Sequence, residues 1–285
     1  MRTKVTMTLL VRDEQDIIED NIRFHHQNGV DSFIVMDNAS TDATSDILNR
    51  LSREIPIDYL YQPQVDYAQS EWVTQMARRA AVDHGADWVI NNDADEFWLP
   101  EHGTYATLLG TLSQDISCVL VQRHNAAVIS EKNTSLSGQT NPRTSCIFET
   151  TSLNIIGKQL PGKMLHRASP HVTVAQGNHH TQDLPGQVID AENLLCILHF
   201  PYRSFPKYTH KIRIGGEAYA RNSVLPVSIG KTWRVHYDQL RAGGLEGVWQ
   251  DITITPNDMA QSLNTGALFT DNRLVDFFDS TTPSN

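Results

Sequence analysis

The sequence is poor in cysteine and has no long hydrophobic run. Its three cysteines, Cys118, Cys146 and Cys196, are widely separated and form no C-x-x-C pair. This usage argues against a disulfide framework or a cysteine-based zinc site and is typical of a reducing compartment. No stretch approaches the roughly 20 apolar residues of a membrane-spanning helix, and the first residues are too polar for a signal peptide. We therefore expect a cytoplasmic protein; peripheral contact with the inner face of a membrane stays open as an alternative.

The common signatures of nucleotide, zinc and nucleic-acid binding are also missing. Neither G-x-G-x-x-G nor G-x-x-x-x-G-K-[ST] occurs, so a phosphate ligand would have to be held in another way. H-E-x-x-H is absent, which leaves a zinc hydrolase without support. Lys and Arg number 23 against 33 Asp and Glu, a formal net charge of −10. Because nucleic-acid binders need a surplus of positive charge, this balance disfavours a nucleic-acid partner.

The charge is unevenly distributed along the 285 residues. Residues 1–100 hold 8 basic and 18 acidic residues, whereas residues 199–241 hold 8 basic and 2 acidic residues. An acidic half that could hold a cation is thus followed by a basic segment that could hold an anion, although two solvated faces would give the same counts. The composition, 40% hydrophobic and 20% charged, is that of a globular chain with one large domain or two small ones.

Short hydrophobic runs alternate with helical patterns over the first hundred residues. The runs predict strands at 5–11, 33–36, 57–61 and 88–90, and helices at 16–27, 43–53 and from an N-cap at Ser70 to the glycine at 85. This alternation is typical of βαβ units and predicts an α/β fold with a Rossmann-like, mostly parallel sheet flanked by helices. Further strands are predicted at 118–122 and 194–198, and a polar loop at 130–145.

Polar residues follow each of the first four predicted strands, where a parallel sheet binds its ligands. The densest group follows the fourth strand, where Asp93, Asp95 and Glu96 place three carboxylates within four residues. These groups repel one another, so the site requires a cation or cationic neighbours. Oxygen ligands at a strand end suit Mg²⁺ or Mn²⁺, and the spacing directs Asp93 and Asp95 to the same side. An acidic turn that caps the next element is the alternative interpretation.

Three segments with their flanking strands resemble a known enzyme family. V-R-D-E-Q-D at 11–16, D-N-A-S-T-D at 37–42 and N-N-D-A-D-E-F-W at 91–98 are similar, in order and spacing, to the family-2-like glycosyltransferases of GT-A fold. The match is to the bacterial branch with DNxSTD and DADEF motifs. It covers about residues 4–100, is weaker over 100–215 and is absent from 242–285. The resemblance implies metal-dependent, inverting transfer of a sugar from a nucleotide-diphosphate sugar to a hydroxyl of a glycan, a lipid-linked glycan or a protein.

The resemblance also implies an organisation of the chain. Residues 1–125 would form the nucleotide-sugar-binding half, which ends in the DxD region. Residues 126–241 would form the acceptor-side and site-closing part of the same domain, with mixed strands. Residues 242–285 would be a C-terminal extension with helices.

The resemblance assigns the donor site residue by residue. Val11 and Arg12 would line the base, Glu14 would lie near the nucleotide, and Asp37 would contact the base or ribose. Asp93 would face the ribose or donor sugar, and Asp95 would bind the Mn²⁺ or Mg²⁺ that bridges the diphosphate. The sequence departs from the family at Asp13 and Arg79, where the family has asparagine. The residues assigned to the nucleotide sugar are Val11, Arg12, Glu14, Asp37, Arg78, Asp93, Ala94, Arg203, Lys207 and Lys211.

A second motif, H-F-P-Y-R-S at 199–204 followed by two lysines, also resembles the family branch. It implies that His199 is a metal ligand supplied from far along the chain. Arg203, Lys207 and Lys211 recur at four-residue spacing, so we expect them on one helical face that meets the diphosphate leaving group. A buried, hydrogen-bonded histidine and a plain basic helix surface are the alternative interpretations.

The general base that takes the acceptor proton is not identified by any motif. The candidates are His179, His180, Asp183 and Glu149. Two other functions stay open on a similar sheet. One is a non-catalytic protein that binds a nucleotide or glycan. The other is a sugar nucleotidyltransferase, which is disfavoured because the segment after the first strand has no glycine.

Overall fold

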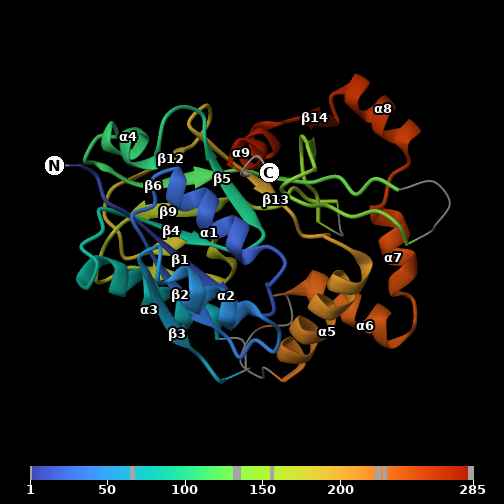
Figure 1. Ribbon diagram of the computed structural model, residues 1–285, viewed down its shortest axis with the longest axis horizontal. Helices are drawn as coiled ribbons and strands as arrows, with labels where there is room; N and C mark the ends of the chain where they lie inside the picture. The colour runs from blue at the N-terminus through green and yellow to red at the C-terminus, as the bar shows by residue number, and fades with distance from the viewer. Residues whose placement is uncertain are drawn as a thin grey trace. The chain divides into compact units, whose positions relative to one another are not determined.

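The computed structural model describes residues 2–64, 68–130, 136–154, 157–221, 226 and 230–281. The chain forms two compact units (Figure 1). Unit 1 comprises residues 1–123 and 161–197, and unit 2 comprises residues 124–160 and 198–285. The division expected at residues 125 and 241 concerns roles in donor and acceptor binding, and it stays a prediction.

Unit 1 is built on a seven-stranded sheet of order β12-β6-β9-β4-β1-β2-β3. The four strands β4-β1-β2-β3 are parallel, and β12 is parallel to β6, whereas β9 runs antiparallel to both β4 and β6. This mostly parallel α/β sheet with flanking helices confirms the predicted fold class. The strands of this sheet are β1 (Val5–Val11), β2 (Ser32–Asp37), β3 (Ile57–Tyr61), β4 (Trp88–Asn92), β6 (Ile116–Val121), β9 (Lys163–Arg167) and β12 (Gln187–Asp190).

Helices and short strands complete unit 1. The chain alternates strand and helix through β4, as predicted, with helix bounds shifted by one or two residues. The helices are α1 (Ile18–Gln27), α2 (Thr44–Leu51), α3 (Gln69–Val82) and α4 (Tyr105–Gly110). The short strands are β5 (Glu96–Pro100) and the hairpin β10 (Thr173–Val174) with β11 (Thr181–Gln182). Strands β7 (Arg123–Asn125) and β13 (Leu195–His199) each contain a boundary between the units.

Helix α3 packs on one face of the sheet through an apolar stripe. Trp72, Met76 and Ala80 recur at helical spacing and are buried against a core cluster that includes Ile34 and Val89. The prediction that Ser70 caps this helix is wrong, because the helix begins at Gln69. The Ser70 hydroxyl instead donates to the carbonyl of Val174 at 2.5 Å. That bond ties α3 to the β10–β11 hairpin.

Unit 2 is mainly helical. Its elements are β8 (Ile147–Glu149), α5 (Phe205–Arg221), α6 (Lys231–Arg241), α7 (Leu245–Ile252), α8 (Pro256–Thr265), β14 (Leu268–Thr270) and α9 (Arg273–Thr281). Strand β14 pairs antiparallel with β8. The predicted C-terminal helices are thus confirmed. Residues 136–145 form no strand or helix, as expected of the polar loop, while 131–135 of that loop lie outside the described residues.

The helices α5 and α6 approach each other closely because α5 carries two buried glycines. A side-chain carbon on Gly215 would lie 2.4 Å from the Trp233 ring, and one on Gly216 would lie 2.2 Å from Tyr237. Beside this contact, Tyr208, Ile212 and Trp249 are buried in one apolar cluster. Larger residues at either glycine would therefore force the helix pair apart.

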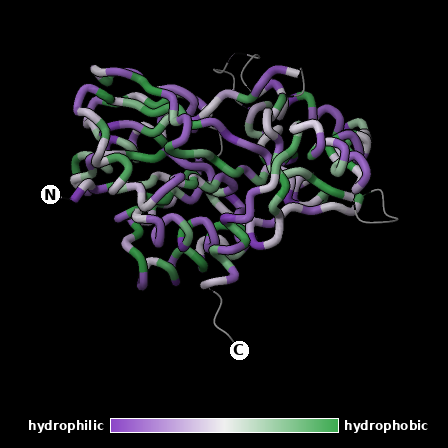
Figure 2. The backbone as a smooth tube through the Cα atoms, turned by 90° about the horizontal axis from the view of Figure 1, so that it is seen from above, coloured by the Kyte–Doolittle hydropathy of each residue, from purple (hydrophilic) through white to green (hydrophobic). Residues whose placement is uncertain are grey.

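Hydrophobic and hydrophilic stretches alternate along the backbone (Figure 2). Among the residues that the structure describes, no helix is long and apolar enough to cross a membrane.

Candidate active site

The parallel strands bring the predicted polar groups to one edge of the sheet. Val11 at the end of β1 pairs with Asp37 at the end of β2, and Leu9 of β1 pairs with Asn92 at the end of β4. The chain therefore leaves β1, β2 and β4 on the same side, which is where a parallel sheet binds its ligands. The sequence prediction that these polar segments gather at one edge is confirmed.

The turn after β2 is held by carboxylates from two strand ends. Asp37 accepts from the Ser40 amide at 2.9 Å and from the Tyr59 hydroxyl at 3.0 Å. Asp13, which has a left-handed backbone (φ 55°), accepts from the Thr41 amide at 2.6 Å. The Asp13 carboxylate thus anchors the turn. The nucleotide contacts implied for Asp37 and for its neighbour Glu14 stay predictions.

The turn after β4 is fixed by the buried side-chain amide of Asn21. The Asn21 side chain of α1 donates to the carbonyls of Ala94 at 2.9 Å and Glu96 at 2.8 Å. Asn92 donates to the same Glu96 carbonyl at 3.2 Å. Asp95 lies inside this framed turn and is 3% exposed. A rigid backbone of this kind holds the carboxylates of the turn in fixed directions.

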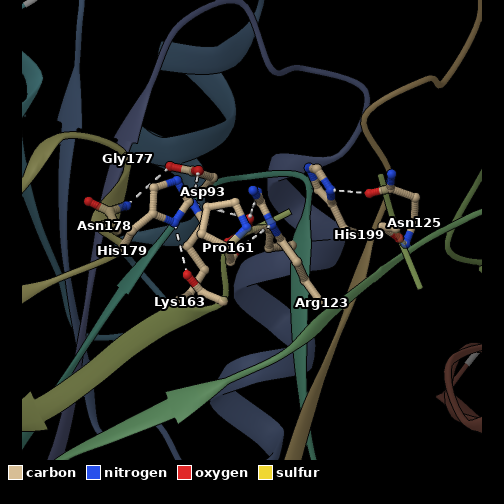
Figure 3. Close-up of polar contacts among 12 residues, drawn as sticks. Asp93, Arg123, Asn125, Pro161, Lys163, Gly177, Asn178, His179 and His199 are labelled. Carbon is tan, nitrogen blue, oxygen red and sulfur yellow. Dashed lines mark hydrogen bonds and ion pairs between the residues drawn. The ribbon is translucent and has the colours of Figure 1, made fainter. Parts of the chain in front are cut away.

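Asp93 is paired with a buried lysine (Figure 3). The Nζ atom of Lys163, on β9, lies 2.5 Å from Asp93 Oδ2 and 3.2 Å from Glu96 Oε1. The Lys163 and Glu96 side chains are 1% and 0% exposed, whereas that of Asp93 is 31% exposed. Arg123 adds a second cation, with its Nη1 atom 3.3 Å from Glu96 Oε1. Burial raises the pKa of the Glu96 carboxyl against the opposing influence of Lys163 and Arg123.

The segment between β10 and β11 reaches Asp93 from another direction. Asn178 has a left-handed backbone (φ 62°), and its Nδ2 atom donates to Asp93 Oδ1 at 3.3 Å. The next residue, His179, directs its Nδ1 atom at the carbonyl of Gly162, 2.9 Å away (Figure 3). Burial, with the nearby charges of Lys163 and Arg123, lowers the pKa of His179 to about 4. An imidazole of such low basicity is a weak proton acceptor, which disfavours His179 as the general base.

The surroundings of Asp93 disfavour a divalent cation, because the Lys163 ammonium in contact with its Oδ2 atom would repel a second positive charge there. In the described ranges, no group of three or more His, Cys, Asp or Glu side chains is arranged to hold a metal. Asp95 stays the predicted metal ligand of this motif, because a hard carboxylate oxygen suits Mg²⁺ or Mn²⁺.

In unit 2, His199 is held by a neighbouring amide. Its Nδ1 atom lies 2.7 Å from Asn125 Oδ1 (Figure 3), and the His199 side chain is buried. Asn125 thus fixes the orientation of the imidazole ring, and the role of His199 as a metal ligand stays a prediction. Glu149 bonds the side chains of Asn125 and Ser152, and burial raises its pKa.

The basic residues that follow His199 do not share one helical face. Helix α5 begins at Phe205, so Arg203 lies before it and is buried at 6% exposure. Lys207 and Lys211 are on α5 and are partly exposed. The expected face of three cations at four-residue spacing is therefore wrong for Arg203, because the helix starts two residues after it.

Arg78 and Asp183 form structural contacts in unit 1. The Arg78 guanidinium donates to the carbonyls of Val172 at 2.8 Å and His171 at 3.4 Å. Asp183, with φ 63°, accepts from the Thr173 hydroxyl at 2.9 Å. These contacts favour the structural interpretation of Arg78. The candidate bases Asp183, His180 and Glu149 stay predictions, and His180 is exposed.

The sequence analysis missed the groups that surround Asp93. Lys163, Arg123 and Asn178 come from three later segments, 30 to 85 residues along the chain. Each follows or opens a short polar stretch next to a strand, which is a signal too common to identify a partner. What the sequence did indicate is that the carboxylates require cations.

The model of glycosyltransferase family 92 matches residues 5–233, and no curated protein matches. Among solved structures, residues 1–349 of TarS from S. aureus, in complex with UDP, are similar at a TM-score of 0.42 and 11% identity. This match covers 85% of this chain and 71% of that one. Glucosyl-3-phosphoglycerate synthase from Mycobacterium tuberculosis, in complex with Mn²⁺, UDP and glucosyl-3-phosphoglycerate, is similar at a TM-score of 0.30 and 21% identity, over 44% of each chain.

The finer resemblance to the family-2-like branch stays a prediction. The match to the family model, by contrast, spans well over half of the 285 residues. The chain therefore belongs to glycosyltransferase family 92.

Proposed function

We propose that the protein transfers a sugar from a nucleotide-diphosphate sugar to an acceptor hydroxyl, with a divalent cation and with inversion at the anomeric carbon. The observation that carries the proposal is the framed turn after β4, where Asp95 is buried at the ligand-binding edge of a parallel sheet. A carboxylate held there with fixed direction suits the recognition of a diphosphate through a cation. Membership of a glycosyltransferase family supplies the reaction class.

The donor side of the site is proposed to use the strand-end residues at this edge. Asp93 accepts a hydrogen bond from a hydroxyl of the ribose or the sugar, and Asp37 and Glu14 lie on the nucleotide side with Val11 and Arg12. Arg12 supports this proposal because its buried Nε atom has no hydrogen-bond partner among the described residues. A buried donor of this kind is expected to find a partner in a bound ligand.

Asp95 is the proposed ligand of Mn²⁺ or Mg²⁺, and His199 is the second candidate ligand. When bound, the cation neutralises negative charge on the diphosphate. Lys207 and Lys211 on α5, with Arg203 before it, are proposed to meet the leaving nucleoside diphosphate. Positive charge placed there stabilises the transition state more than the ground state, because negative charge grows on the leaving group.

The proposal is tested by thermal unfolding with three nucleotide sugars, UDP-glucose, UDP-N-acetylglucosamine and GDP-mannose, each with and without Mn²⁺. A donor at about 100 times its Kd adds roughly 2.7 kcal/mol to the stability, which is readily seen as a shifted Tm. We expect a Mn²⁺-dependent shift with one donor in the wild type. The shift should be lost in Asp95→Asn and kept in Asp46→Asn, which changes an exposed carboxylate on α2.

Product analysis separates the remaining functions. Release of a nucleoside diphosphate with transfer of the sugar supports the proposal. Release of pyrophosphate would identify a nucleotidyltransferase, and binding without turnover across an acceptor panel would identify a binding protein. The absence of a Tm shift with every donor would refute the proposal.

A further inference from the structure

Lys163 is a buried lysine with two carboxylate partners. It opens β9, the antiparallel strand between β4 and β6, and pairs there with Val121. Its ammonium contacts Asp93 Oδ2 at 2.5 Å and Glu96 Oε1 at 3.2 Å. Burying an ammonium is costly unless its charge is compensated, so Lys163 and its two partners depend on one another.

Asn178 is a second side chain that holds the Asp93 carboxylate, independently of Lys163. Its left-handed backbone (φ 62°) costs energy in a residue other than glycine, and such strain persists where the surrounding structure holds it. The Asn178 side chain is buried, its Nδ2 atom donates to Asp93 Oδ1, and its Oδ1 atom has no hydrogen-bond partner in the described part of the chain. The amide nitrogen of Asn178 thus bonds Asp93, while its amide oxygen is left without a hydrogen-bond partner among the described residues.

Two cationic side chains of the protein lie beside the carboxylates of this turn. Lys163 contacts both Asp93 and Glu96, and Arg123 contacts Glu96. The Lys163 ammonium, in contact with Asp93 Oδ2, compensates the charge of that carboxylate from within the protein.

We infer that Lys163 and Asn178 are positioning residues, which fix the Asp93 carboxylate in one orientation and reserve it for a hydroxyl of the donor instead of the metal. The inference rests on the proposed function. Each oxygen of Asp93 has one donor from the protein, one from Lys163 and one from Asn178. A carboxylate oxygen has a second lone pair, and the Asp93 side chain is 31% exposed, so it can still accept from a bound ligand.

The first test replaces Asn178 by glycine, a substitution that is expected to preserve the fold. Asn178→Gly removes the amide and relieves the left-handed backbone, so the variant is expected to fold at least as well as the wild type. The matched control is Asn193→Gly, because Asn193 has the same φ of 62° in the turn between β12 and β13. We expect Asn178→Gly to bind the nucleotide sugar about tenfold more weakly or worse, with Mn²⁺ affinity unchanged, and Asn193→Gly to match the wild type. The readouts are calorimetric titrations with Mn²⁺ alone and with UDP-glucose, UDP-N-acetylglucosamine and GDP-mannose.

Two variants of Lys163 test the charge compensation without any donor. Lys163→Met leaves the Asp93 and Glu96 carboxylates without their shared cation, so added Mn²⁺ should raise its Tm more than it raises that of the wild type. The double variant Lys163→Met with Asp93→Asn should lose this extra gain. Lys163→Arg keeps the charge and should need no Mn²⁺ for stability.

The outcomes separate the inference from the proposed function. If the wild type binds none of the nucleotide sugars, the proposed function fails and the inference falls with it. If the wild type binds a donor and Asn178→Gly binds it equally well, the inference alone is overturned. It is also overturned if Asn178→Gly loses Mn²⁺ affinity together with donor affinity, because Asp93 would then serve the metal.

Discussion

The contact between α5 and α6 predicts opposite effects for one substitution at two glycines of unit 2. In Gly216→Ala the new carbon would lie 2.2 Å from Cγ and 2.4 Å from Cβ of Tyr237, where ordinary contact needs at least 3.4 Å. The helices must therefore separate by about 1 Å, or Tyr237 must leave its position. Overpacking of this kind costs about 1–3 kcal/mol, whereas alanine gains about 1 kcal/mol in helix propensity. We expect a net loss of up to about 2 kcal/mol.

Gly247→Ala is the matched control. Gly247 lies in α7 and has no atom within 4 Å of the position that the new carbon would take. Only the helix propensity changes there, so we expect a gain of about 0.5–1 kcal/mol. Both residues belong to unit 2, which allows one denaturation assay to report on both.

Urea unfolding followed by tryptophan fluorescence measures the two changes, since Trp233 and Trp249 lie in this unit. For a protein of this size, 1 kcal/mol corresponds to about 2–4 °C in Tm, which gives an independent check. If Gly216→Ala proved as stable as Gly247→Ala, the close approach of α5 and α6 would be refuted. The contact bears on the proposed function because Lys211, one of the proposed leaving-group cations, lies on α5 with its Nζ atom 5.9 Å from the centroid of the Trp233 ring.

Three further predictions concern single side chains. Burial lowers the pKa of His25 to about 3, whereas this side chain takes up a proton near pH 6.5 in the unfolded chain. The free energy of unfolding of the wild type should therefore fall by about 2 kcal/mol through this residue between pH 7 and pH 5. Urea unfolding curves at the two pH values should show that His25→Gln lacks this part of the pH dependence. Arg78→Met should lower stability by about 1 kcal/mol without changing the KM for the donor, because Arg78 bonds backbone carbonyls; a raised KM at unchanged stability would restore its donor role. Asn125→Leu should weaken Mn²⁺ binding 10- to 100-fold in calorimetry if Asn125 orients His199 as a metal ligand, and an unchanged affinity would remove His199 from the metal site.

Local sequence patterns predicted the strands and helices of the first hundred residues. The apolar run of β1 and the helical spacing of Trp72 and Met76 on α3 predicted elements that the structure confirms. These predictions succeeded because each element buries one or both of its faces, so its apolar residues follow a recognisable pattern in the sequence. The position of the polar segments followed from the parallel order alone, since parallel strands end at one edge.

The failures come from contacts that are distant in sequence or from a helix boundary. Ser70 is a good N-cap by residue type, yet its hydroxyl donates to Val174, 104 residues away. No local rule could weigh that bond against the cap. The start of α5 was readable, because Pro206 fits only the first turn of a helix and so places Arg203 outside it.

The cations around the DxD turn show why a motif can indicate chemistry without locating its parts. The repulsion among Asp93, Asp95 and Glu96 requires positive charge nearby, and the sequence left open whether a metal or the protein supplies it. For Asp93 and Glu96 the protein does, through Lys163. That contact depends on β9 entering the sheet antiparallel between β4 and β6, which alternation of strands and helices does not predict. The two aspartates of one motif thus differ in what the structure shows of them: Asp93 is paired with a lysine of the protein, and Asp95 is the carboxylate that we propose as the cation ligand.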